Sequence, residues 1–135
     1  SIFYLDFDKT NLESIKHPGE RQEIFVTFLI ENIRDVSVNA VNEGDLFKNS
    51  ETGGMLGKVI NKTVSHAQIA TTDKNGNIIY VDVPDRYNMK IVFECSGTIS
   101  EENIKISNEP IQIGESITLE SKIIKTNGTV FGIEY

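Results

Sequence analysis

The chain has 135 residues, of which 39% are hydrophobic, so it is long enough for one domain around a single core. Its net charge of −7 repels phosphate backbones and anionic lipid headgroups, which argues against nucleic acid and peripheral membrane binding. The single cysteine, Cys95, excludes an internal disulfide and a thiolate metal cluster, and we expect it to be a small core hydrophobe.

The first strong strand signal runs from Glu23 to Glu31, where β-branched and aromatic residues fill both faces, as in a central strand. Residues 34–42 are ambiguous. The alternation of Val36 and Val38 suits a strand, whereas Asp35 as an N-cap suits one helical turn, and we expect a short helix near residues 36 to 42.

A long hairpin is expected next. Residues 57–71 predict a long strand or a pair of strands, Asn75-Gly76 predicts a type I′ turn, and residues 78–83 should fold back. Residues 84–87 predict a loop. The strand that follows places alternate side chains on one face, namely Met89, Ile91, Phe93 and Cys95.

Shorter strands are expected at residues 103–107, 116–119 and 129–135, with a second Asn-Gly turn at Asn127-Gly128. Pro110 excludes a central strand position because it lacks an N–H to donate. Because no helical periodicity is sustained, the sequence predicts an all-β fold, a small antiparallel barrel or sandwich with at most one or two short helices.

One pattern occurs twice, a turn glycine followed by an acidic residue and then an apolar stretch closed by another glycine. The first copy runs from Gly44-Asp45 to Gly57, and the second from Gly114-Glu115 to Gly128. Glycine serves positions where the chain turns with positive φ or bends sharply. The repetition therefore predicts a pseudo-duplicated β domain.

The first candidate for chemistry is the N-terminal run from Phe3 to Thr10. It resembles the nucleophile motif of haloacid-dehalogenase-type phosphatases, in which an apolar strand precedes Asp-x-Asp-x-Thr, here Asp6 and Asp8. One Asp of that motif attacks phosphorus and the other is a general acid, with Mg²⁺ held nearby. That family needs a parallel sheet with intervening helices, whereas this chain predicts hairpins.

The remaining candidates have structural explanations. Residues 73–78 superficially resemble part of a calcium loop, but Thr71 and Asp82 stand where its first and last ligands belong, so a hairpin turn is favoured. His17 and His66 have no second histidine or cysteine at ligand spacing. A nucleophilic site combining Cys95 with His66 conflicts with the apolar neighbours of Cys95.

Two sequons, Asn61-Lys62-Thr63 and Asn127-Gly128-Thr129, matter only in a glycosylating compartment. We assign no catalytic, cofactor-binding or metal residue.

The succession of glycine and apolar positions also carries a resemblance to a known family. Its residues are 25–28, 41–45, 53–59, Gly76, Pro84, 113–117 and 128–130. Over residues 20 to 135 the chain resembles an uncharacterised family of bacterial single-span proteins, catalogued as a domain of unknown function. The resemblance implies a membrane anchor before Ser1, as the missing initiator methionine also suggests, with residues 1–20 as a juxtamembrane connector and residues 21–135 as a single β domain.

The glycine-acid turn followed by Leu56-Gly57 and Val59 is also similar to the barrel modules of cell-shape and adaptor proteins of the bacterial envelope. The first functional hypothesis is therefore a non-enzymatic, extracytoplasmic domain of a membrane-anchored envelope protein, acting as a protein-interaction or scaffold module. An alternative is a glycan- or peptide-binding domain with a cleft lined by loops such as residues 49–54 and 84–87, which exposed Tyr80 or Tyr87 would favour. A Mg-dependent phosphatase fragment using Asp6 and Asp8 is the third.

Overall fold

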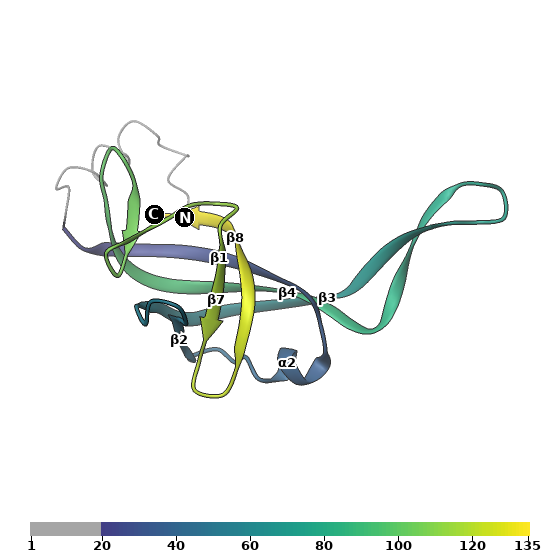
Figure 1. Cartoon of the computed structure of the whole chain (residues 1–135), viewed down its shortest axis with the longest axis horizontal. Helices are drawn as coiled ribbons and strands as arrows, with labels where there is room; N and C mark the ends of the chain where they lie inside the picture. The colour runs from purple at the N-terminus through teal and green to yellow at the C-terminus, as the bar shows by residue number, and fades with distance from the viewer. Residues whose placement is uncertain (1–19) are drawn as a thin grey trace.

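A computed structural model describes residues 20–135 of the chain (Figure 1). This part is an eight-stranded antiparallel sheet with one short helix, which confirms the predicted all-β class. The elements in chain order are β1 (Gln22–Ile33), α2 (Asp35–Asn39), β2 (Leu46–Asn49), β3 (Met55–Thr72), β4 (Ile78–Ile99), β5 (Ile104–Ile106), β6 (Glu109–Ile111), β7 (Ser116–Glu120) and β8 (Lys125–Glu134).

Six of these strands form a closed ring of pairings. Their order is β1-β8-β7-β2-β3-β4, and β4 returns to pair with β1. Closing a sheet on itself removes exposed strand edges. The β5–β6 hairpin extends the sheet from β4. Pro110 lies in β6, which pairs with β5 alone among the described strands, so the proline occupies an edge strand as expected.

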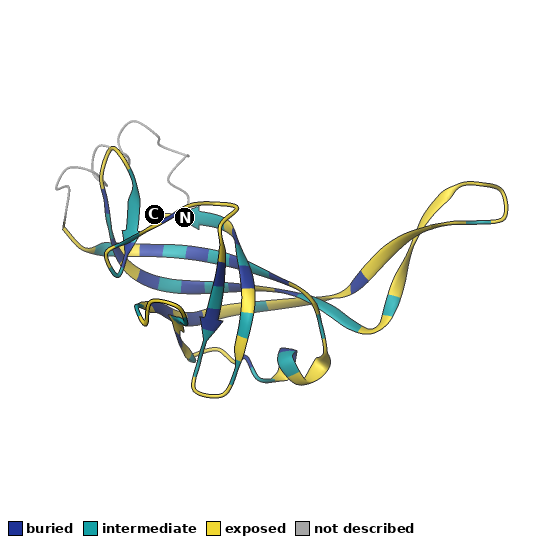
Figure 2. Ribbon diagram, viewed as in Figure 1, coloured by how far each residue is buried: buried dark blue, intermediate teal, exposed yellow. Residues whose placement is uncertain are grey.

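The core fills the interior of the ring (Figure 2). Alternate residues of β1 are buried, and so are the four residues of β4 that were predicted to share a face: Met89, Ile91, Phe93 and Cys95. The ring of Phe93 meets Phe28 edge-on at 5.5 Å and Phe47 at 5.3 Å. Because the opposite face of β4 is more exposed, burial on one side explains the period of two in its sequence.

The first glycine-acid turn leads into β2. Gly44 has φ of +94°, which favours glycine, and its N–H donates to the Val59 carbonyl oxygen at 2.8 Å. The Val59 N–H donates back to the Asp45 carbonyl at 2.9 Å. The Asp45 carboxylate accepts a hydrogen bond from the Asn42 N–H at 2.9 Å, which explains why an acid follows the glycine.

The second turn, which leads into β7, repeats these contacts. Gly114 has φ of +97°, and its N–H donates to the Val130 carbonyl at 2.8 Å. Val130 N–H donates to the Glu115 carbonyl at 2.9 Å, and the Glu115 carboxylate accepts from the Gln112 N–H at 3.2 Å. The repeated sequence pattern therefore corresponds to a repeated structure.

The correspondence extends around the ring. Exchanging β1 with β4, β2 with β7 and β3 with β8 reproduces the same order of pairings, so the ring has an approximate twofold scheme. The two halves differ in their connections, because α2 lies between β1 and β2 whereas the β5–β6 hairpin lies between β4 and β7.

The expected short helix is present, although it begins one residue earlier and ends three residues earlier than the predicted residues 36 to 42. Arg34 is the N-cap, Asp35 is the first helical residue, and no side chain caps the N-terminus. The C-terminal end is held instead by Lys62, whose ammonium donates to the carbonyls of Val38 at 3.0 Å and Val41 at 2.7 Å.

The prediction of a turn at Asn127-Gly128 is wrong. Both residues lie inside β8, where Gly128 pairs with Ile117, and the β7–β8 turn closes through a hydrogen bond from Ser121 N–H to the Ile124 carbonyl at 2.8 Å. A Cβ at Gly128 would approach the buried Leu119 side chain to 2.9 Å, so this glycine serves close packing rather than a turn.

The predicted loop at residues 84–87 is part of the continuous strand β4. The register with β3 shifts between His66 and Gln68, where residues 83–86 bulge opposite the single residue Ala67. Asp85 takes a φ of +59° within this bulge. The chain therefore accommodates Pro84 with a bulge and resumes pairing at Tyr87.

Candidate functional site

The most distinctive feature of the described surface is a two-stranded arm that projects from the ring (Figure 1). We define the arm as residues 67–86, which lie beyond the His66–Tyr87 pair of β3 and β4. At that pair β1 still accompanies β4, because Ile33 is opposite Tyr87. Further out, β3 and β4 pair only with each other among the described strands.

The base of the arm is held by specific contacts. The rings of His66 and Tyr87 stack at 5.2 Å between centroids, with 34° between their planes. Tyr87 also packs against the core, and Ala67 is buried at the position of the bulge. Asn32 N–H donates to the Asn88 side-chain oxygen at 3.0 Å. These contacts join the arm to the ring at a defined position.

The tip of the arm is polar. The Asp73 carboxylate accepts hydrogen bonds from the N–H groups of Asn75 at 2.8 Å and Asn77 at 2.9 Å, and Gly76 N–H donates to the Asp73 carbonyl at 3.0 Å. The predicted hairpin is therefore confirmed. Its turn is not type I′, because Gly76 has positive φ whereas Asn75 does not.

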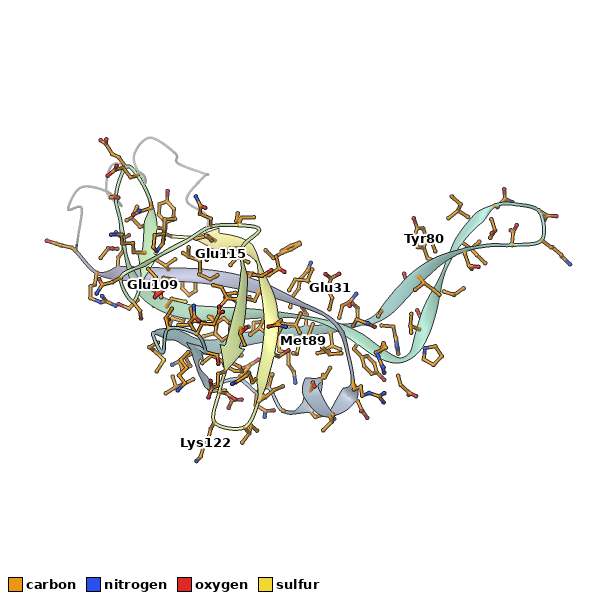
Figure 3. All side chains as sticks on the ribbon, viewed as in Figure 1. Glu31, Tyr80, Met89, Glu109, Glu115 and Lys122 are labelled. Carbon is orange, nitrogen blue, oxygen red and sulfur yellow. The ribbon has the colours of Figure 1, made fainter. Side chains whose placement is uncertain are left out.

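Both faces of the arm are apolar. Cross-strand partners share a face, and the register pairs Ile69 with Val81 and Thr71 with Ile79. We call Ile69, Ile79 and Val81 the aliphatic face; their exposed fractions are 56%, 40% and 37%. The opposite face presents Ile78 and Tyr80, each 69% exposed (Figure 3).

No charged residue occurs between Gln68 and Thr72 or between Ile78 and Val81. An isolated two-stranded hairpin is marginally stable in water, and a monomeric protein rarely exposes contiguous apolar surface without a use for it. The arm thus combines the two properties of a protein-binding element: backbone edges that no other described strand pairs with, and apolar side chains on both faces.

The segments expected to line a ligand cleft do not form one together. The loop at residues 49–54 lies against the β5–β6 hairpin, where Ser107 Oγ donates to the Met55 carbonyl at 2.6 Å. The cavity between them, beside Glu109 and Glu115 (Figure 3), has a volume of about 30 Å³, room for about one water molecule. Residues 84–86 belong instead to the arm, and they do not line this cavity.

A shallow hollow of about 390 Å³ lies between residues 44–46 and residues 121–123. Leu46 and Ile123 border it and are 59% and 69% exposed. Elsewhere on the ring a hydrogen bond between the Glu23 and Glu94 side chains, followed by desolvation and by repulsion between the two carboxylates, raises the pKa of Glu23. Lys58 lies 3.8 Å from the Glu94 carboxylate and offsets part of that negative charge.

Cys95 is a core residue, as predicted. It is 4% exposed and its thiol donates to the Phe93 carbonyl at 3.7 Å. Burial first, and the negative charge of Glu94 second, raise the pKa of Cys95 to about 12. At neutral pH the thiolate that nucleophilic chemistry requires is therefore suppressed.

The other candidates for chemistry are not brought together. Asp6, Asp8 and His17 lie outside the described residues. His66 stacks on Tyr87 at the base of the arm, far along β3 from Cys95's partner Gly57. Within residues 20–135 no three His, Cys, Asp or Glu side chains converge as metal ligands.

The sequons and the calcium-like segment have local roles. Asn61 is exposed on β3, and the Asn127 side chain accepts a hydrogen bond from Thr118 Oγ1 at 2.9 Å. The Asp73 carboxylate is engaged by the turn of the arm. All strand pairings of the described part are antiparallel, unlike the parallel sheet that the phosphatase motif requires.

Comparison with known families places the chain. The model of a domain of unknown function, DUF4330, matches residues 1–134. The chain belongs to this family. The match agrees with the predicted membership of an uncharacterised domain family. Neither the curated proteins nor the solved structures include a significant match to the chain. Within the part of this DUF4330 domain that the structure describes, no helix is long and apolar enough to cross a bilayer.

Sequence reasoning identified the hairpin but missed the arm as a projecting element. The available signal was the lack of charged residues on both strands of the arm, at residues 68–72 and 78–81, together with apolar residues on both faces of these strands. A strand that covers a core on one side alternates apolar with polar residues, whereas these strands do not. No local signal indicates where β1 stops pairing with β4, which is the point where the arm begins.

Proposed function

We propose that this DUF4330 domain is a non-enzymatic protein-interaction or scaffold module of a membrane-anchored bacterial envelope protein, on the extracytoplasmic side, and that the arm is its binding element. The observation that carries the proposal is the arm itself, a β-ribbon with exposed Ile69, Ile78 and Tyr80 extending from a closed ring. The resemblance of residues 20–135 to single-span bacterial proteins supports the anchored location.

The chemistry of the arm favours protein over other partners. Its strand edges, which pair with no other strand of residues 20–135, offer N–H and C=O groups to a further strand, and its apolar faces offer area to bury. The net charge of −7 disfavours polyanions. The interior of the ring is filled by side chains such as Phe28 and Phe93, which leaves protein contact as the function best supported by the outer surface.

Site-specific photo-crosslinking in cells tests the binding role. A photoreactive phenylalanine analogue replaces Tyr80 on the arm in the full-length gene product, and a matched variant carries it at Ile123, which is equally exposed on the β7–β8 turn. We expect discrete crosslinked protein species from position 80 that are absent from position 123. Equal crosslinking from both positions, or none from position 80, would contradict the proposal.

Fractionation of the full-length gene product tests the location. We expect it in the membrane fraction, with the arm cleaved by protease added to intact spheroplasts, because residues 74–77 at the tip of the arm are exposed. Recovery in the cytosol, or protection of the domain until the membrane is lysed, would refute the extracytoplasmic assignment.

A further inference from the structure

We infer that an extended segment of another protein adds as a strand to the outer edge of β3 in the arm, where Gln68, Ala70 and Thr72 direct their backbone groups away from β4. The inference rests on the proposed role of the arm as a binding element, and it names the edge and the chemistry of the partner. In strand addition the main chain of the partner supplies the hydrogen bonds, and its alternate side chains contact the faces of the sheet.

The outer edge of β3 is covered at its start and open beyond it. β4 pairs with one edge of β3, whereas β2 pairs with the other edge only within residues 55–58. Two hydrogen bonds then join Val59 to the first glycine-acid turn. From Ile60 to Thr72 no strand of residues 20–135 pairs with this edge. An added strand would therefore continue, along the same edge, the pairing that β2 begins.

The turn of the arm determines which backbone groups lie on this edge. The Asp73 N–H donates to the Asn77 carbonyl at 2.9 Å, so these two residues form a hydrogen-bonded pair. Hydrogen-bonded and non-hydrogen-bonded pairs alternate along an antiparallel ladder. Every second residue of β3 before the turn therefore directs its N–H and C=O groups outward, namely Thr72, Ala70 and Gln68. An extended backbone supplies acceptors and donors at this spacing, whereas a lipid surface does not.

The other edge of the arm is unsuited to a continuous added strand, because residues 83–86 bulge out of the ladder. Within this bulge Pro84 has no N–H to donate, and Asp85 has a φ of +59°. Prolines, bulges and charges keep strand edges from pairing. β3 has no proline and no bulge of its own over residues 61–72. Its one charged residue there, Lys62, donates to two carbonyls at the end of α2.

The side chains beside this edge indicate the composition of the partner segment. A strand next to β3 would place alternate side chains beside Ile69, which lies opposite Val81 on the aliphatic face. The intervening side chains would lie beside Ala70, whose small side chain leaves Tyr80 within reach across the arm. We therefore expect a segment in which β-branched or aromatic residues alternate, because such pairs stabilise neighbouring strands.

The charge of the chain favours a different protein over a second copy. Two copies would each carry a net charge of −7, and a net charge far from zero opposes self-association. A segment that is neutral or basic meets no such repulsion. We therefore expect the partner segment to carry a net charge of zero or above.

Proline substitutions in the photo-crosslinking assay test the inference. Ala70→Pro is combined with the photoreactive analogue at position 80 in the full-length gene product, and it removes an outward N–H of β3 without removing a bond to β4. Ile78→Pro is the matched control, because it removes an outward N–H from the β4 edge. We expect Ala70→Pro to reduce the crosslinked protein at least about tenfold and Ile78→Pro to leave it unchanged. Far-UV circular dichroism verifies that both variants are folded.

Hydrogen exchange resolved to single residues gives an independent readout. In the free chain the outward N–H groups of Gln68, Ala70 and Thr72 should exchange faster than those of Ile69 and Thr71, which bond to β4. In the purified crosslinked complex the three outward groups should exchange at least about tenfold more slowly than in the free chain, whereas groups on the β4 edge should be unchanged.

Equal effects of the two proline substitutions, or slower exchange on the β4 edge instead of the β3 edge, would overturn the inference. So would a crosslink to a second copy or within one chain. These failures differ from failure of the proposed function. A different protein that crosslinks from position 80 despite Ala70→Pro overturns strand addition alone, whereas absence of any crosslink from position 80 removes both.

Discussion

Substitution of Gly57 by alanine tests how closely β3 and β4 approach. Gly57 lies opposite Cys95, and an added Cβ would stand 2.3 Å from the Glu94 carbonyl oxygen and 3.0 Å from Cys95 Sγ. The first contact is with backbone and is more than 1 Å shorter than the 3.4 Å at which ordinary contact begins. Relief therefore requires the two strands to separate, because rotation of a side chain cannot remove the clash.

The expected loss follows from two opposing effects. Overpacking a filled interior costs about 1–3 kcal/mol, and the backbone clash places Gly57→Ala near the upper end. The reduced entropy of the unfolded alanine chain offsets about 0.4–1 kcal/mol. We expect a net loss of about 2 kcal/mol in the free energy of unfolding.

Gly128→Ala is the matched control, since Gly128 occupies the corresponding position of the second hairpin. There an added Cβ meets side-chain atoms rather than backbone, Leu119 Cδ1 at 2.9 Å and Phe28 Cδ2 at 3.2 Å, and side chains can yield without separating the strands. We therefore expect a loss below about 1 kcal/mol.

Urea unfolding followed by far-UV circular dichroism measures both variants, because the chain has no tryptophan to report by fluorescence. In a thermal melt the loss at Gly57 corresponds to roughly 6–12 °C. Equal midpoints for the two variants, or a larger loss at Gly128, would refute the close backbone approach of β3 and β4.

Three further outcomes are expected. The raised pKa of Glu23 means that the folded chain binds a proton at this carboxyl more tightly than the unfolded chain does. The free energy of unfolding therefore falls as the pH rises from the ordinary pKa of 4.5 through the folded pKa. Glu23→Gln removes this fall, so urea titrations should show that the variant is more stable than the parent chain at pH 7 and equally stable below about pH 4. A thiol reagent at pH 8 should label Cys95 only after unfolding, since its pKa is about 12, and rapid labelling of the folded chain would contradict this. Asp73→Ala removes the acceptor of two turn hydrogen bonds, so amide exchange in the arm should quicken about tenfold while the global urea midpoint stays unchanged.

Much of the ring was predictable from sequence because burial on one side imposes a period of two. The alternation from Met89 to Cys95 identified the buried face of β4, and the pairs Gly44-Asp45 and Gly114-Glu115 identified two equivalent turns. In each turn a positive φ selects glycine and a side-chain hydrogen bond selects the acid, so the signal is local and can be read without knowledge of the fold.

The predictions were wrong where contacts between strands determine the local structure. Gly128 follows an asparagine, as in a turn, but it is favoured by the close approach of Leu119, on the neighbouring strand β7, and of Phe28, which is remote in sequence. Pro84 suggested a loop, yet pairing of Tyr87 with both Ile33 and His66 keeps β4 continuous across a bulge. Nothing local to residues 84–87 specifies those partners.

The position of the candidate site was beyond sequence reasoning for the same reason. Residues 67–86 become an arm because β1 ends at Ile33 and no other described strand continues beside them. The side chains that define the site, such as Ile69 and Ile79, have the composition of an interior strand. Only the three-dimensional arrangement shows that they face outward.

The matching hydrogen bonds of the two turns, at Gly44 and Gly114, bear on the origin of the domain. Duplication and fusion of one ancestral half would leave this correspondence: a shared pairing scheme, with freely diverging inserts such as α2 in one half and the β5–β6 hairpin in the other. The same division is useful in protein design. If α2 and the β5–β6 hairpin were exchanged between the halves, each would be followed by an equivalent glycine-acid turn before the next strand.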